Sequence, residues 1–360
     1  MSTDDSSTRS PSYFDDERFH QTLTIPPTPT RSTPLKVTYA DFGHRNTDKV
    51  LLFCGPLFGS RYVLTPKDTL AQTHSIRIIS LDRPGFGSTT DASSPCTRIH
   101  LWLTMVSAVL SHLHIPYISI LAHSGGAIYA MNILLHLGHL LHPSRPYIAL
   151  CTPWIHPSKS SVSLLKVAAG LIPNALVGRF NHVVRFIQGT VFPAVNFSSG
   201  VIGSSIMQSP PGFIAPGVDP TTVITEEKLS AEMIRRVNRE DMRGLGQDAL
   251  LLLKRDEYPG CWGEWGDYDT LVPMLARREE RTNRNNNNNK PLQVSVYFAE
   301  ADHMIGTVTG PEWFEDCWSA DKRGDCINYT SCVIPKSDHD SILAARYGVM
   351  ERVFKDMSGE

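Results

Sequence analysis

The stretch that decides the fold is YISILAHSGGAIYAMNILLHL, residues 117–137. A short apolar run, residues 117–122, meets His-Ser-Gly-Gly and continues into apolar residues at helical spacing. A run this short and this apolar suits a strand buried on both faces, so the stretch predicts a strand, a very tight turn and a helix. A small residue, any residue, Ser, any residue and Gly on such a turn form a nucleophile elbow, with Ala122 first and Ser124 at the apex.

The elbow makes Ser124 the candidate catalytic nucleophile. The turn is so tight that the residues two before and two after the serine must be small, and the serine itself is strained. Its hydroxyl is expected above the sheet at a helix N-terminus, where free N–H groups favour negative charge. The plainer alternative is a Gly-rich turn with an idle serine, and the flanking strand and helix disfavour it.

The same pattern recurs along the chain and predicts the fold class. Apolar β-rich runs end in Gly, Pro or polar residues at 49–54, 76–82, 147–153, 292–300 and 328–335. Helical spacing lies between them, as in 97–114, 126–142 and 341–355. Alternating strands and helices predict an α/β fold, a mostly parallel central sheet with helices on both faces and right-handed crossovers.

Composition divides the chain into five segments. Residues 1–34 are rich in Ser, Thr, Pro and Asp and are expected to form a flexible tail. The first part of the core spans 35–154, and its second part spans 291–360. Between them, 155–275 reads as a helical cap inserted over the strand ends, and 276–290 as an Asn-rich loop. The cap is expected to roof a pocket, and the less favoured alternative is that its helices only pack on the sheet.

A serine hydroxyl needs a base, and His339 is the candidate. It stands just after the last predicted strand and just before the last predicted helix, in SDHDSIL, residues 337–343. In chains of this architecture the nucleophile comes first, the acid second and the histidine last, so the base is expected near this position. The chain has 14 histidines, but most others fall in helical stretches or loops. Position therefore favours His339.

The base needs an orienting acid, and Asp302 is the leading candidate. It follows the predicted strand LQVSVYFAE, 292–300. Glu300 is the second choice, and Asp267 and Asp269 are outside possibilities. The adjacent His303 would point away from the site if Asp302 points in, since neighbouring side chains of an extended segment face opposite ways.

A tetrahedral oxyanion needs two backbone donors. Gly125, directly after the nucleophile, is expected to supply one. The loop after the strand at 49–54 should supply the other. Pro56 has no N–H, so Leu57 is the first choice and Phe58 the next.

Three stretches of the chain resemble one known family. LDRPGFGS (81–88) resembles the DRPGxGxS turn, CGPLFGSR (54–61) the HGxPGSR loop, and SGGAIYA (124–130) the SGGGPYA helix of α/β-hydrolases of the hydrolase-1 type. The resemblance is close over about 49–153 and looser over 292–355. Three departures stand out: Cys54 replaces His, three residues rather than two separate Gly55 from Gly59, and Ala122 replaces Gly. The first two bear on the second oxyanion donor.

The resemblance implies hydrolysis of an ester, lactone or thioester without a cofactor, or acyl transfer, and no cluster of residues has the spacing of a metal site. Members of this fold that open epoxides or remove halides use Asp as nucleophile, and Ser124 argues against both. The first expectation is a serine hydrolase acting on a small or medium apolar ester. The alternatives are an acyltransferase with the same residues and a non-catalytic binding protein on a hydrolase fold.

Bulk properties narrow the class of partner. The 360 residues are 41% hydrophobic and carry a net charge of −2. Without a basic stripe, nucleic acid is not an expected partner, and a small acyl substrate is the expected one.

The polar N-terminus lacks a signal-peptide pattern, and no run is apolar enough for stable membrane insertion, so a cytoplasmic location is expected. Seven dispersed cysteines without CxxC spacing argue against a disulfide framework or a zinc site. The oligomeric state is left open.

Overall fold

A computed structural model describes residues 12–160, 162, 177–178, 212–254, 258–285 and 290–359. Most of residues 161–211, which belong to the predicted cap, lie outside the described residues, and so do Asn286–Asn289 of the predicted Asn-rich loop.

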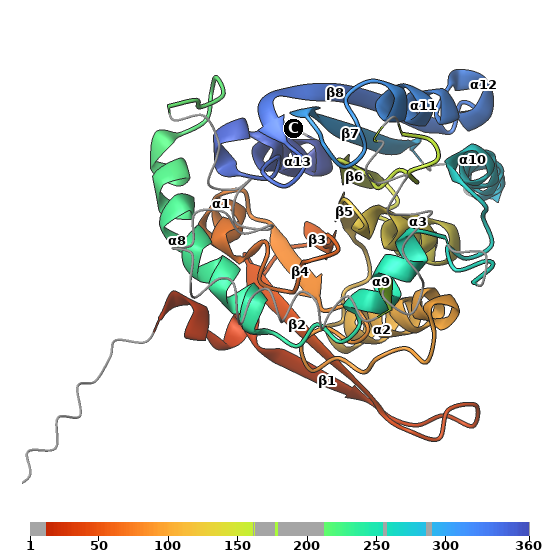
Figure 1. Ribbon diagram of the computed structural model, residues 1–360, viewed down its shortest axis with the longest axis horizontal. Coiled ribbons are helices and arrows are strands. Elements are labelled where there is room, and N and C mark those ends of the chain that lie inside the picture. Colours follow the sequence, from red (N-terminus) through yellow and green to blue (C-terminus); the bar gives the residue numbers. More distant parts are fainter. Residues whose placement is uncertain are drawn as a thin grey trace, which may run out of the picture.

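One eight-stranded sheet forms the centre of the molecule, in the order β1-β2-β4-β3-β5-β6-β7-β8 (Figure 1). β1 and β2 pair antiparallel with each other, as do β2 and β4, and the remaining neighbours are parallel. The mostly parallel sheet predicted from the strand and helix alternation is therefore confirmed. The strands are β1 Gln21–Ile25, β2 Leu35–Gly43, β3 Val50–Cys54, β4 Arg77–Leu81, β5 Ser119–His123, β6 Tyr147–Cys151, β7 Leu292–Ala301 and β8 Ile327–Asp338.

Helices cover both faces of the sheet (Figure 1). One face carries α1 (Asp68–Thr73) and α13 (Val349–Ser358); the other carries α2 (Arg98–His112), α3 (Gly126–Leu137), α10 (Tyr268–Asn285) and α11 (Thr309–Cys317). The shorter helices are α12 Ala320–Arg323 and the 3-10 turns Tyr13–Asp15, Glu17–Phe19, Thr65–Lys67, Pro95–Thr97, Gly138–Leu140 and Ala345–Tyr347. Among the helices that the structure describes, none is long and apolar enough to cross a bilayer.

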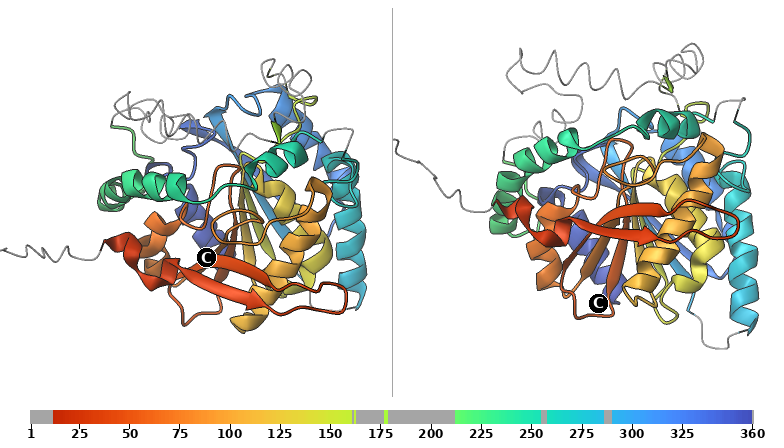
Figure 2. Two further views of the ribbon diagram at one scale, coloured as in Figure 1. Left: turned by 60° about the horizontal axis from the view of Figure 1, so that its bottom comes forward. Right: turned by 90° about the horizontal axis from the view of Figure 1, so that it is seen from below.

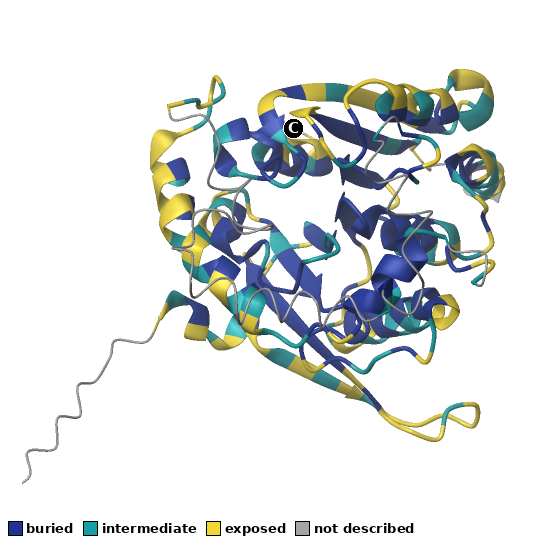
Figure 3. Cartoon of the chain, in the orientation of Figure 1, coloured by how far each residue is buried: buried dark blue, intermediate teal, exposed yellow. Residues whose placement is uncertain are grey.

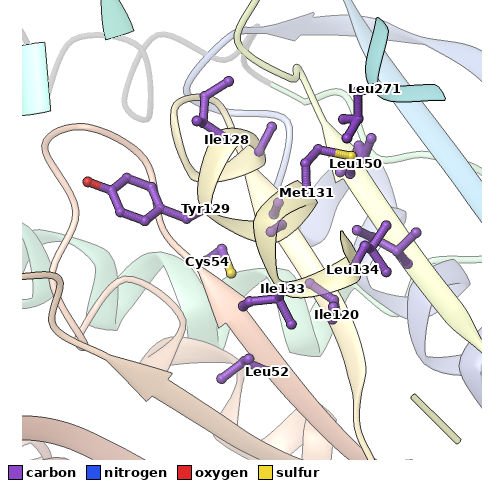
Figure 4. Packing of buried hydrophobic residues seen from close by; sticks show 14 of the residues in the cluster. Leu52, Cys54, Ile120, Ile128, Tyr129, Met131, Ile133, Leu134, Leu150 and Leu271 are labelled. Carbon is purple, nitrogen blue, oxygen red and sulfur yellow. The ribbon is translucent and has the colours of Figure 1, made fainter. Parts of the chain in front are cut away.

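The central strands divide their side chains between two apolar cores. In β3, Leu52 and Cys54 join the core under α3, whereas Leu51 and Phe53 join the opposite core. Figure 4 shows the first of these cores, where Leu52 and Cys54 face the side chains of α3. The alternation follows from the period of two along a strand. Burial on both faces is why these strands are apolar throughout (Figure 3).

The first correction concerns the N-terminus, where residues 1–34 were predicted to form a flexible tail. From Ser12 onward the segment is ordered: Phe14 and Phe19 are 1% and 0% exposed, and β1 pairs with β2. Arg18 binds Asp68 at the start of α1, with Nη2–Oδ2 at 3.0 Å. The segment is rich in Ser, Pro and Asp, but it also contains Phe14 and Phe19. The burial of these two rings offsets the conformational entropy that is lost when the segment becomes ordered.

The segment between β6 and β7 supplies the helices that lie above the strand ends. α8 (Pro220–Arg239) and α9 (Leu245–Leu252) lie across one end of the sheet, whereas α10 runs alongside the strands (Figure 2). α8 and α9 fall within the region predicted to be a helical cap.

A second correction concerns residues 276–290, which were predicted to form an Asn-rich loop. α10 continues through Asn285, so residues 276–285 are helical. The sequence ARREERTNRN consists largely of good helix formers, and Leu275, Ala276 and Glu279 are buried. The run of asparagines led to a predicted loop that begins about ten residues too early, at residue 276.

Candidate active site

Ser124 occupies the tight turn between β5 and α3 that the sequence predicted. Its φ is +52°, in the left-handed region that costs a residue with a side chain conformational energy. Two backbone hydrogen bonds hold the turn: Ser124 N–H donates to Cys151 O at 3.0 Å, and Trp154 N–H donates to Ser124 O at 3.0 Å. The strained conformation is therefore fixed by the residues at the end of β6.

The turn also explains the small residue two positions after the serine. A Cβ on Gly126 would lie 2.0 Å from the carbonyl oxygen of Cys54 and 2.6 Å from that of Gly55. No side chain fits at such distances, so α3 can start against the end of β3 only with glycine at this position.

Three side chains from distant parts of the chain form one hydrogen-bonded line. Ser124 Oγ lies 2.8 Å from His339 Nε2, and His339 Nδ1 lies 2.8 Å from Asp302 Oδ2. With a neutral imidazole, the hydroxyl donates to Nε2 and the Nδ1–H donates to the carboxylate. The structure thus brings together the three residues selected from the sequence, and the arrangement can move a proton from the serine to the histidine.

Asp302 is held by the turn that follows β7. Its Oδ1 accepts from the backbone N–H groups of Met304 and Ile305 at 2.8 and 2.9 Å, which leaves Oδ2 for His339. The alternative acid Glu300 is exposed and accepts from the N–H of Lys336 instead. Only Asp302 of these two candidates reaches the histidine.

The surroundings of His339 suit it to accept a proton. Burial by itself lowers the pKa of the imidazole, but the charge and hydrogen bond of Asp302 raise it, helped by Asp340 and Asp338. The net result is a pKa above the ordinary 6.5. A more basic imidazole abstracts the serine proton more readily.

His123 and Thr152, which the sequence analysis overlooked, fix the backbone of His339. His123 Nε2–H donates to the carbonyl oxygen of His339 at 2.8 Å, and Thr152 Oγ1 donates to the same oxygen at 3.3 Å. Burial lowers the pKa of His123 to about 4, so this ring is neutral near pH 7. The signal in the sequence was the position of His123 directly before the nucleophile.

The two predicted oxyanion donors follow the ends of two neighbouring strands, β5 and β3. Gly125 follows Ser124 at the start of α3, and Leu57 lies in the half-buried loop after β3. Among the described residues, no hydrogen-bond acceptor is found for the N–H of Gly125 or of Leu57. Gly59 N–H donates to Pro56 O at 2.9 Å, so a tight turn accommodates the additional residue of this loop.

Cys54, which stands where the resembled family has histidine, belongs to the core. Its side chain is 1% exposed, and burial raises the pKa of the thiol to about 12. The thiol therefore stays protonated, and Cys54 packs in the core and does not act as a nucleophile. In the described ranges, no group of three or more His, Cys, Asp or Glu side chains could hold a metal ion.

The comparisons with known proteins rest on structure alone. No protein-family model matches this sequence, and no curated protein matches it. Among solved structures, the chain is similar to an enol-lactonase from Burkholderia xenovorans, with 12% identity, a TM-score of 0.54 and coverage of 91% of this chain and 97% of that one.

Two further structures show the same likeness. A thermophilic esterase from Thermogutta terrifontis has 17% identity and a TM-score of 0.55, with 94% of this chain and 97% of that one covered. An epoxide hydrolase from Vigna radiata has 14% identity and a TM-score of 0.52, with 95% and 99% covered. Together with the strand order and the turn at Ser124, these likenesses show that the chain has the fold of the α/β-hydrolase superfamily.

Proposed function

We propose that this protein is a serine hydrolase that cleaves an acyl bond through an acyl-enzyme on Ser124. The observation that carries the proposal is the unbroken line from Ser124 Oγ through His339 to Asp302, with 2.8 Å at each step. The left-handed φ of Ser124 and its place before α3 support it, since both present the hydroxyl where a developing anion is stabilised.

The reaction follows from the proton positions. His339 Nε2 takes the proton of Ser124 as Oγ attacks the acyl carbon, while Asp302 holds the Nδ1 tautomer and stabilises the imidazolium. The tetrahedral oxyanion accepts from the N–H groups of Gly125 and Leu57. The imidazolium then protonates the departing alcohol or thiol. Water, activated by the same histidine, releases the acid and restores Ser124.

An apolar ester, lactone or thioester of small or medium size is the proposed substrate class. Leu252 of α9 packs against Gly125, and half-buried Leu57 carries the other proposed donor. Apolar groups beside the reacting carbonyl favour apolar acyl or alcohol groups. The similar solved structures include proteins named as an enol-lactonase and an esterase.

Acyl transfer is a second candidate because the reacting groups have little contact with bulk water. Ser124 and His339 are 6% and 5% exposed. A dry site lets an alcohol, amine or thiol compete with water for the acyl-enzyme. Product analysis with p-nitrophenyl acyl esters and added alcohol separates the two: only free acid indicates hydrolysis, and new ester indicates transfer.

A fluorophosphonate probe tests the nucleophile directly. We expect the native protein to gain one adduct, located by mass spectrometry on the peptide that contains Ser124, and Ser124→Ala to gain none. Ser119→Ala is the matched control, since Ser119 is a buried serine of β5, the strand that leads to Ser124, and this variant should still be labelled. An unlabelled native protein, beside a labelled reference hydrolase, would contradict the proposal and support the binding-protein alternative.

A further inference from the structure

We propose that Arg83 positions the oxyanion loop, residues Gly55–Gly59, and that Asp248 of α9 holds Arg83 in place. The proposal rests on the proposed function, because it gives a helix of the inserted segment a part in stabilising the oxyanion.

The side chain of Arg83 grips three consecutive peptide groups of the oxyanion loop. Nη1 donates to Gly55 O at 2.5 Å, and Nη2 donates to Pro56 O at 2.7 Å and to Leu57 O at 2.9 Å. A guanidinium is planar and rigid, so three such contacts fix both the place and the tilt of these peptides.

The grip on the carbonyl groups sets the direction of the N–H groups. In a trans peptide, the C=O of one residue and the N–H of the next point in opposite directions. Because Arg83 holds the carbonyl of Pro56, the N–H of Leu57 must point away from the guanidinium. Leu57 is the proposed second oxyanion donor, so Arg83 determines the orientation of that donor.

The oxyanion loop lies directly against the turn that carries the nucleophile. The carbonyl groups of Cys54 and Gly55, at the start of the loop, lie against Gly126. Gly126 is only two residues after Ser124 in sequence. A shift of the loop by about 1 Å would therefore change the geometry around the reacting carbonyl, and misplacements of this size can slow a reaction about 100-fold.

Asp248 fixes Arg83 from the inserted segment. Its Oδ2 accepts from Arg83 Nε at 2.7 Å, while its Oδ1 accepts from Arg98 Nε at 2.6 Å and from the hydroxyl of Tyr129. Arg83, Arg98 and Asp248 are all buried, and Asp91 supplies a second carboxylate to Arg98, so the two guanidinium charges depend on these two carboxylates for compensation. The cluster ties α9 to α2 and to α3, the helix that begins at the nucleophile.

One face of α9 contacts Gly125 directly and, through Arg83, the loop that contains Leu57. Asp248 and Leu252 are four residues apart and therefore lie on the same side of the helix. Asp248 holds Arg83, whereas Leu252 carries a methyl group 2.9 Å from where a Cβ on Gly125 would lie. α9 therefore packs against one proposed donor and holds the arginine that positions the other.

Arg83→Lys is the principal test, since the lysine keeps a charge for Asp248 but cannot grip three carbonyl groups. We expect kcat to fall about 100-fold with little change in KM, and an aryl boronic acid, which mimics the tetrahedral adduct, to lose affinity in parallel. Hydrogen exchange of the peptide that contains the oxyanion loop should become faster. Asp248→Asn should produce the same changes to a smaller extent.

Asp41→Asn is the matched control. Asp41 is a buried carboxylate that binds Arg77, with Oδ1–Nε at 2.8 Å, at the start of β4, whereas Arg83 follows the end of that strand. This variant should leave kcat and the exchange of the loop unchanged. If the loop exchanges as slowly in Arg83→Lys as in the native protein, or if kcat and KM change by similar factors, the positioning role is wrong. A native protein without activity or labelling would instead refute the proposed function, while loop exchange would still show whether Arg83 and Asp248 hold the loop.

Discussion

Two buried histidines lie side by side at the ends of β5 and β8, and their pKa values are shifted in opposite directions. The rings of His123 and His339 are 5.7 Å apart, and both residues are at most 5% exposed. Burial lowers the pKa of His123 to about 4, whereas Asp302, together with Asp340 and Asp338, raises the pKa of His339 above its ordinary value.

The difference comes chiefly from the carboxylate of Asp302. Asp302 accepts the Nδ1–H of His339, whereas Nδ1 of His123 has no partner among the described residues. His123 instead uses Nε2–H to hold the backbone of His339. One imidazole is thereby prepared to exchange a proton and the other to stay neutral as a fixed donor. Residue type and burial alone therefore do not identify a base.

The largest effect should separate the two rings by activity. We expect His339→Gln to reduce kcat/KM for an activated ester by roughly 10⁶-fold, since a nucleophile without its base is almost inert. His123→Gln keeps an N–H donor toward the carbonyl of His339 and should stay within about tenfold of the native rate. Equal losses in both variants, measured at the same pH on folded protein, would show that His339 is not the specific base.

Asp302→Asn should turn His339 into a residue more like His123. The amide removes the negative charge that outweighs burial, so the pKa of His339 should fall. We expect kcat/KM to drop roughly 10⁴-fold, as for an orienting acid of this kind. Only the neutral imidazole accepts a proton, so the activity of the native protein should have a pH midpoint above 6.5. The remaining activity of Asp302→Asn should have a lower midpoint.

Glu300→Gln is the control for that variant, because Glu300 neighbours Asp302 in sequence but binds Lys336. It should preserve both the rate and the midpoint. A midpoint that stays in place in Asp302→Asn would mean that other groups set the basicity of His339.

The smallest effect concerns acid stability. The pKa of His123 is lowered from 6.5 to about 4 in the folded protein. Between pH 6.5 and pH 4, His123 is therefore protonated in the unfolded chain but neutral in the folded chain. Its stabilising contribution is present above pH 6.5 and is lost as the pH falls toward 4. At about 1.4 kcal/mol per unit, the loss amounts to about 3 kcal/mol.

Urea unfolding of the native protein and of His123→Gln at pH 7.5 and pH 4.5 measures this loss. The variant should lose less stability between the two conditions than the native protein, because glutamine does not titrate. Parallel losses would show that His123 takes up its proton in the folded state.

Much of the candidate site could be predicted because its signals are local. The turn at Ser124 is written in consecutive residues, and chain order placed Asp302 after β7 and His339 after β8. Parallel strands end at the same edge of the sheet, which brings such loops together. Arg83 lay within a recognised motif, but nothing in that motif indicated which groups it binds. Asp248 stood in an unremarkable helical stretch, about 165 residues away.

The errors at the N-terminus and at α10 have the same origin. Composition reports the average of a segment, whereas order depends on where a few side chains are buried. Phe14 and Phe19 become anchors only because β2 and α1 lie beneath them. Glu279 is buried in a helix that composition assigned to a loop.

The sequence by itself determined the alternation of strands and helices, the sharp turn at Ser124 and the order of nucleophile, acid and base. These features depend on the period of apolar residues and on steric limits within a few neighbouring residues. Only the tertiary structure decided which of two adjacent histidines is basic and which carboxylate holds Arg83 against the oxyanion loop. Desolvation and Coulomb energy depend on distances between groups that the chain separates by up to 216 positions, as with His123 and His339.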